Sequence, residues 1–205
     1  MTTQNREINH KKNWKDYLGE SIMIIFSVLL ALILSENAND LHDKQNTKLQ
    51  LRGIVNELRH NKKALQEMHI YNLQVLNKID SALVNVKMQN EIVSNDEFHL
   101  NLIAPEGVLY RYFDNEAWNV AKNNNILSKM DIQAVTMLTK LYEDQERISK
   151  IEGEVAKIIF DRASRDPKQV HLTLMLIRDI YHGWAVDREP GLITQIDEAI
   201  QLIKN

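Results

Sequence analysis

The chain has 205 residues and a formal net charge of −3, and it contains six glycines, three prolines and no cysteine. Because so few glycines and prolines interrupt it, the composition favours an all-α fold over a sheet-rich fold that needs many turns. The slightly acidic balance offers no basic face to a polyanion, so nucleic acid is not expected as a partner. The absence of cysteine excludes disulfides, thiolate metal sites and a cysteine nucleophile.

The longest apolar stretch of the chain covers residues 22–34. As a helix this stretch spans only about 20 Å, whereas the hydrocarbon layer of a bilayer is about 30 Å thick. A helix extended over residues 17–38 reaches about 33 Å, which is long enough to cross. The sequence therefore predicts a transmembrane anchor at 17–38, preceded by a tail at 1–16.

The residues on either side of this stretch indicate its orientation. Trp14 and Tyr17 lie at its start, where interfacial aromatic residues are common. Acidic residues follow it, and basic residues precede it: Arg6, Lys11, Lys12 and Lys15. This distribution predicts a single-pass protein of a bacterial inner membrane, with a cytoplasmic N-terminus and an extracytoplasmic C-terminal part.

Two alternatives to a retained anchor stay open. A signal peptide would be removed after a pair of small residues in an A-x-A-like pattern, and the residues from Ser35 to Ala38 do not supply that pair. A buried or interfacial helix is the other alternative, because the apolar stretch itself is short.

Within the predicted anchor, small and polar residues form a narrow stripe. At 100° per residue, Ser27, Ala31 and Ala38 project close to the direction of Glu20, among Ile, Leu, Val and Phe. Small residues let membrane helices approach closely, and a carboxylate is tolerated best when it faces protein or water. We hypothesise a helix–helix contact along this stripe; the alternative is that Glu20 reaches the cytoplasmic interface.

Residues 39–90 follow a heptad pattern and predict a long amphipathic helix. Nine of the eleven a and d positions between Leu51 and Val86 are apolar. The exceptions are Asn61 and Asn72, which we interpret as a polar core that sets the register or the oligomeric state. The helix either forms a coiled coil or packs on its own domain, and the need of the later helices for a partner favours the second.

The remaining residues, 91–205, predict a helical domain that packs back on the long helix. Ser94 and Glu97 have capping-box spacing and predict a helix at 95–103. Asp114 is expected as the N-cap of the next helix, which ends in an Asn triplet suited to a left-handed residue. A helix at 128–164, another after Asp166-Pro167 and a last one from Pro190-Gly191 complete the expected set.

No pattern in the sequence indicates catalysis, a metal or a cofactor. Glu57-x-x-His60 and Asp179-x-x-His182 have the spacing of di-iron ligands, but about one such pair is expected by chance from seven histidines and 28 acids. The heptad frame also directs Glu57 and His60 toward solvent. We therefore expect no enzyme, and we expect the aromatic residues to be core: Tyr110, Tyr112, Phe113, Trp118 and Trp184.

Two regions carry a resemblance to a known group of proteins. The stretch "GESIMIIFSVLLALILSENAND" followed by "LQLRGIVNELRHNKKAL" resembles the start of a broad group of uncharacterised single-pass bacterial inner-membrane proteins. In these, a Gly-Glu-containing apolar helix runs into a long helix with a Glu-Leu-x-x-Asn stretch, here Glu57, Leu58 and Asn61. Their Ala-Trp pair and later Leu-Tyr pair match Ala117, Trp118, Leu141 and Tyr142. The resemblance implies topology and a helical domain, and it implies no activity.

The sequence leaves two classes of function. The first is a membrane-anchored helical interaction or scaffold protein that binds a protein partner or a second copy. The second is a membrane-active effector, or an accessory subunit of a larger inner-membrane complex.

Overall fold

The computed structural model describes residues 14–109 and 111–204. The basic residues Arg6, Lys11 and Lys12 of the predicted tail, and Tyr110, lie outside the described residues, as do the side chains of Lys15 and Trp184. The chain divides into two compact units, residues 1–48 and 49–205, and α1 contributes to both. The division falls inside the predicted long helix at 39–90, and the predicted boundaries at 16, 38 and 90 stay predictions.

The fold is all-α, as the composition predicts. One two-stranded hairpin is the sole sheet among the described residues. The helices and strands are α1 (Trp14–Leu83), α2 (Val86–Ile92), β1 (Val93–Ser94), β2 (Glu97–Phe98), α3 (Glu116–Asn123), α4 (Ile132–Ser149), α5 (Ile151–Phe160), α6 (Val170–Ile180) and α7 (Glu189–Lys204). Short 3₁₀ turns and a π-helical segment, Tyr181–Val186, connect them.

A single helix, α1, contains both the predicted anchor and most of the predicted long helix. No proline interrupts residues 14–83, and the helix continues through Gly53, where an added Cβ would lie 3.6 Å from Cβ of Ala117 on α3. The helix ends at Leu83, earlier than predicted, because Asn85 caps α2 by accepting a hydrogen bond from the backbone of Met88.

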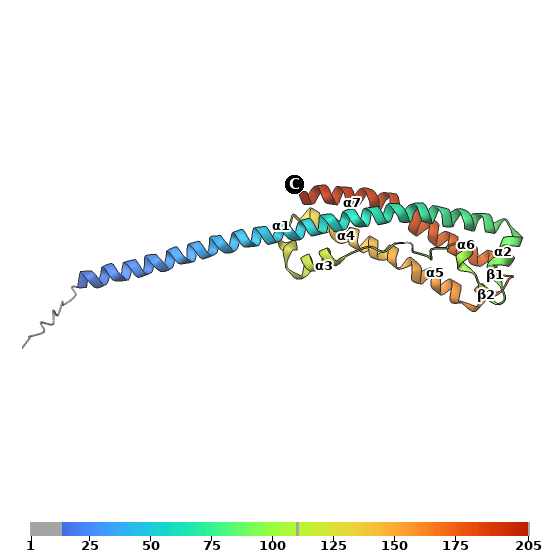
Figure 1. The fold of residues 1–205 in the computed structure, drawn as a ribbon, viewed down its shortest axis with the longest axis horizontal. Coiled ribbons are helices and arrows are strands. Elements are labelled where there is room, and N and C mark those ends of the chain that lie inside the picture. Colours follow the sequence, from blue (N-terminus) through green and yellow to red (C-terminus); the bar gives the residue numbers. More distant parts are fainter. Residues whose placement is uncertain (1–13, 110, 205) are drawn as a thin grey trace, which may run out of the picture. The chain divides into compact units, whose positions relative to one another are not determined.

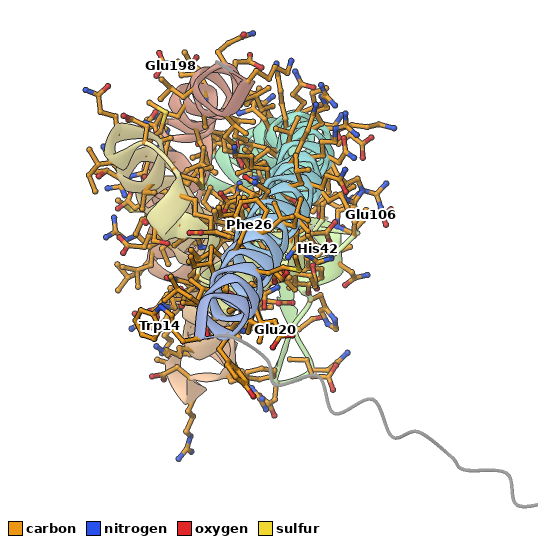
Figure 2. The ribbon with its side chains drawn as sticks, turned by 90° about the vertical axis from the view of Figure 1, so that its left-hand side faces the viewer. Trp14, Glu20, Phe26, His42, Glu106 and Glu198 are labelled. Carbon is orange, nitrogen blue, oxygen red and sulfur yellow. The ribbon has the colours of Figure 1, made fainter. Side chains whose placement is uncertain are left out.

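In the first unit, the apolar stretch of α1 is exposed. The large apolar side chains from Ile22 to Leu34 are between 45% and 69% exposed, and Trp14, at the start of the helix, is 75% exposed and projects from it (Figure 2). This helix is long and apolar enough to cross a membrane, and a signal sequence near the N-terminus would look the same.

In the second unit, the heptad face of α1 is buried against the unit's own helices. Residues Ile54, Leu58, Leu65, Met68 and Ile79 are fully buried. Side chains of α1 contact α4, α6 and α7 through hydrogen bonds, while α4 packs against α7 and α5 against α6 (Figure 1). The structure therefore agrees with the packing of the long helix on its own domain.

The predicted helix at 95–103 is wrong. Val93 pairs with Phe98 and Ser94 with Glu97 in an antiparallel hairpin. Asn95 and Asp96 form its two-residue turn with φ of 54° and 60°. Asn and Asp tolerate this left-handed conformation, which a type I′ turn requires at both positions, so turn chemistry outweighed the capping-box spacing.

The predicted helix at 128–164 is broken in two. It begins at Ile132, with the Asp131 side chain accepting from the backbone of Gln133, and it is interrupted at Lys150 between α4 and α5. The N-cap of α3 is Asn115 and not Asp114. The left-handed residue expected in the Asn triplet is present at Asn125, with φ of 56°.

Candidate functional site

A buried carboxylate on α1 organises the first polar cluster. Glu57 accepts hydrogen bonds from the backbone N–H groups of Ala117, at 2.6 Å, and Trp118, at 3.2 Å. It also accepts one from the hydroxyl of Tyr142 on α4, at 2.6 Å. The N-cap residue of α3, Asn115, makes no side-chain cap, so a carboxylate from another helix caps α3 and stabilises the positive end of its dipole.

One turn further along α1, Asn61 connects α1 to α4 and to the segment just before α3. Its Oδ1 accepts from the backbone N–H of Asp114 at 2.9 Å, while its Nδ2 donates to the backbone carbonyl of Asp114 at 2.7 Å. The same Nδ2 donates to Oε1 of Gln145 at 3.1 Å. Asn61 is fully buried, and Nε2 of Gln145 has no partner among the described residues.

Two aromatic rings complete this cluster. Trp118 and Tyr142 stack with an interplanar angle of 1° and ring centroids 5.1 Å apart, and Nζ of Lys122 lies 5.6 Å from the Trp118 centroid. Burial raises the pKa of the Tyr142 hydroxyl, and its hydrogen bond to Glu57 raises this pKa further. The hydroxyl therefore stays protonated and remains a donor to Glu57.

A cleft of about 390 Å³ opens beside the aromatic pair. Its walls come from the start and body of α3 and from α4, and they include Phe113, Trp118, Lys122, Tyr142, Gln145 and Glu146. These residues supply aromatic surface, amides and charges of both signs, which suit binding. The described residues contain no group of three His, Asp or Glu side chains that could hold a metal ion.

A second polar cluster joins α1 to α7. Glu189 is fully buried; its Oε2 lies 2.7 Å from Nδ1 of His69, and its Oε1 accepts from Nδ2 of Asn72 at 2.7 Å. Burial raises the pKa of Glu189 to about 7, although the hydrogen bonds from His69 and Asn72 act in the opposite direction. Oδ1 of Asn72 has no partner among the described residues.

The structure thus brings Asn61 and Asn72 into buried clusters of their own chain. Glu20, Ser27, Ala31 and Ala38 lie in the first unit, where all four are exposed and Ser27 donates to the backbone carbonyl of Met23. The role of this stripe as a helix–helix contact stays a prediction.

The expectation that Glu57 points to solvent is wrong. Its carboxylate is buried because α3 and α4 cover that side of α1, which the heptad frame could not include. His60 is exposed as expected and pairs with Asp114 at 2.6 Å. Among the aromatic residues, Trp118 is core, but Tyr112 is 61% exposed and donates to Glu152.

Sequence reasoning missed Gln145 and Glu189 altogether. Gln145 lies between the apolar positions Leu141 and Ile148 of α4, and this periodicity could have indicated a buried amide. Glu189 stands beside Pro190 at a helix start, where an acidic residue is common on the surface, so its sequence context gave no signal of burial.

Comparison with protein-family models, with curated proteins and with solved structures finds no match for this chain.

Replacement of Glu57 by Ala should destabilise the protein by about 2–4 kcal/mol, because one buried N–H group, one partly buried N–H group and one hydroxyl lose their acceptor. Tyr142→Phe should cost about 1 kcal/mol, and the double variant should lose less than the sum because the two residues share one hydrogen bond. Urea unfolding of the full chain in detergent, followed by circular dichroism, measures these losses. Glu146→Gln, on an exposed residue of the same cleft, is the control; equal losses at Glu57 and Glu146 would contradict the capping role.

Replacement of Asn72 by Leu should lower stability by about 1–3 kcal/mol, because the buried carboxyl of Glu189 loses a hydrogen-bond donor. If α1 instead paired with a second copy through this face, the same change would raise Tm and blur the oligomeric state. Thermal unfolding combined with analytical ultracentrifugation separates these outcomes. Asn77→Leu, an exposed asparagine on α1, serves as the matched control.

Proposed function

We propose that the protein is a membrane-anchored helical interaction or scaffold protein. The observation that carries the proposal is the exposure of every large apolar side chain from Ile22 to Leu34, in a chain whose second unit has a buried core of its own. Exposing this much apolar surface to water is unfavourable by about 25 cal/mol per Å². A lipid bilayer removes this cost, because it surrounds the apolar side chains with lipid. A helix can cross it because the backbone N–H and C=O groups are hydrogen-bonded within the helix itself.

Retention of the anchor is favoured over cleavage by two features. Small residues in the A-x-A-like pattern are missing after the apolar stretch. In addition, α1 continues without interruption from Trp14 to Leu83 and contributes the central helix of the second unit. The segment at 17–38 would then be the transmembrane part of a helix that also belongs to the folded domain.

The basic residues before the apolar stretch support a cytoplasmic N-terminus and an extracytoplasmic domain. The resemblance to single-pass bacterial membrane proteins supports an inner-membrane location. In the second unit, the buried polar groups of both clusters bond to other helices of the chain. Binding through the surface, to a protein partner or to a second copy, is the function that this arrangement supports best.

The alternative is a membrane-active effector or an accessory subunit of a larger inner-membrane complex. It is favoured by the stripe of Glu20, Ser27, Ala31 and Ala38, since a carboxylate and small residues on one face suit contact within a membrane. Conductance or toxicity on overexpression that disappears when residues 17–38 are exchanged for an unrelated anchor would favour this alternative.

Alkaline phosphatase fused after Asn205 should be active, and green fluorescent protein fused there should not fluoresce after Sec-dependent export. The protein should remain in the membrane fraction after a carbonate wash, and deletion of residues 22–34 should abolish both membrane retention and phosphatase activity. A fluorescent fusion with inactive phosphatase would overturn the proposed topology. Recovery of the intact chain as a soluble protein would overturn the anchor itself.

Single-cysteine variants in this cysteine-free chain test the stripe. Ser27→Cys and Ala31→Cys should form disulfide dimers on oxidation in native membranes if the anchor pairs with a second copy, because these positions would lie at the contact. Leu29→Cys, on the opposite side of the helix, is the matched control and should cross-link several-fold less. Equal or absent cross-linking at all three positions would eliminate self-association through this stripe and leave only a different membrane protein as its partner.

A further inference from the structure

The attachment of α7 to α1 rests on very different contacts at its two ends. Its first residue, Glu189, is fully buried and bonds to His69 and Asn72 of α1. Further along, Asp197 pairs with Lys62 of α1 at 2.6 Å, but Asp197 is 54% exposed. A salt bridge that is as exposed to solvent as this one contributes little to the stability of a protein. Along its length α7 also buries Leu192, Ile196, Ala199 and Ile200.

The chain that leads into α7 is irregular. Residues Tyr181–Val186 form a π-helix, which closes wider turns than the α-helix before it, and the backbone N–H of Asp187 bonds back to the carbonyl of His182. Such segments inside helices frequently mark functional sites. The buried carboxyl thus stands at the first residue of α7, immediately after a break in helical regularity.

We propose that Glu189 is a proton-dependent latch: its neutral carboxyl holds α7 against α1, and loss of its proton loosens α7 while the remaining helices stay folded. The latch is a regulatory device that goes beyond the proposed anchoring and interaction function. Loosening of α7 would uncover the apolar residues that it shares with α1 and α4, and so would change the surface offered to a partner.

The groups around Glu189 come from α1, from the π-helix and from the residues just before α7. From α1, the groups that contact it are His69, which is 24% exposed, and the neutral Asn72. Two residues before Glu189, Asp187 pairs with His182 of the π-helix at 3.0 Å. Arg188 lines a separate cleft with Asp144 and Arg147 of α4. The hydrogen bonds from His69 and Asn72 favour the ionised carboxyl, but the larger effect is burial, which favours the neutral carboxyl.

The direction of the pH effect follows from the pKa. Burial raises the pKa of Glu189 from 4.5 to about 7, so the fold favours the protonated form. The stabilisation from the neutral carboxyl is fully present below pH 4.5 and is lost as the pH rises through about 7. Within this window the opening equilibrium of α7 can change by up to about tenfold per pH unit.

Hydrogen exchange of the full chain in detergent, read by mass spectrometry, tests the latch. After correction for the intrinsic exchange rate, the protection of α7 amides should fall by about tenfold or more between pH 5 and pH 8. The protection of amides in α5 should change far less. In Glu189→Gln, which has no titratable group at this position, the protection of α7 should be the same at both pH values.

Three results would overturn the latch. The first is that the protection of α7 amides in the unaltered protein is the same at pH 5 and pH 8. The second is that amide protection falls equally in every helix between these pH values. The third is that the protection of α7 falls as much in the Glu189→Gln variant as in the unaltered protein. Asp197→Asn is the matched control, because it removes the exposed ion pair of the same helix and should leave the pH response intact. If Glu189→Gln fails to fold, the comparison of α7 with α5 in the unaltered protein and in Asp197→Asn still decides between a latch and a uniform loss of stability.

Discussion

The second unit depends on one carboxylate that joins three helices. Glu57 of α1 accepts two backbone N–H groups at the start of α3 and the hydroxyl of Tyr142 on α4. Without this acceptor, the backbone N–H groups of Ala117 and Trp118 in the first turn of α3 would lose their hydrogen-bond partner, since Asn115 does not cap the helix. The same bonds hold Trp118 and Tyr142 in their stacked arrangement, and these two rings form one wall of the cleft.

Asn61 and Asn72 extend this constraint along α1. The backbone of a helix satisfies its own hydrogen bonds, so a buried amide on it must find its partners on other helices. Asn61 finds them on the segment before α3 and on α4, and Asn72 finds one on α7. Because a shift of α1 by one turn would leave these amides unpaired, they favour a single alignment of the helices around it.

The first unit differs from the second in the exposure of its apolar side chains. Its apolar residues have no cover within the described part of the chain. The proposed anchor supplies that cover from lipid, whereas the second unit supplies it from its own helices. If the proposal is right, α1 changes from an environment without water to a buried helix of a folded domain within a single unbroken element. Glu20 and the small residues of the stripe would then be the positions at which the anchor could contact protein.

The sequence by itself determined the class of the fold, the exceptional apolar helix and the face of the long helix that is buried, because these follow from composition and from the spacing of apolar residues. It also marked Asn61 and Asn72 as polar residues in a core. Tertiary structure alone decided what those residues bond to, that Glu57 is buried, and that Glu189 carries a carboxyl closed off from solvent. The physical reason is that burial of a polar side chain depends on which helices cover it, and partners such as Glu57 and Tyr142 are 85 residues apart in the chain. Local turn chemistry at Asn95 and Asp96, where two adjacent left-handed residues close a hairpin, likewise outweighed a helix-capping pattern that was correct in spacing but wrong in context.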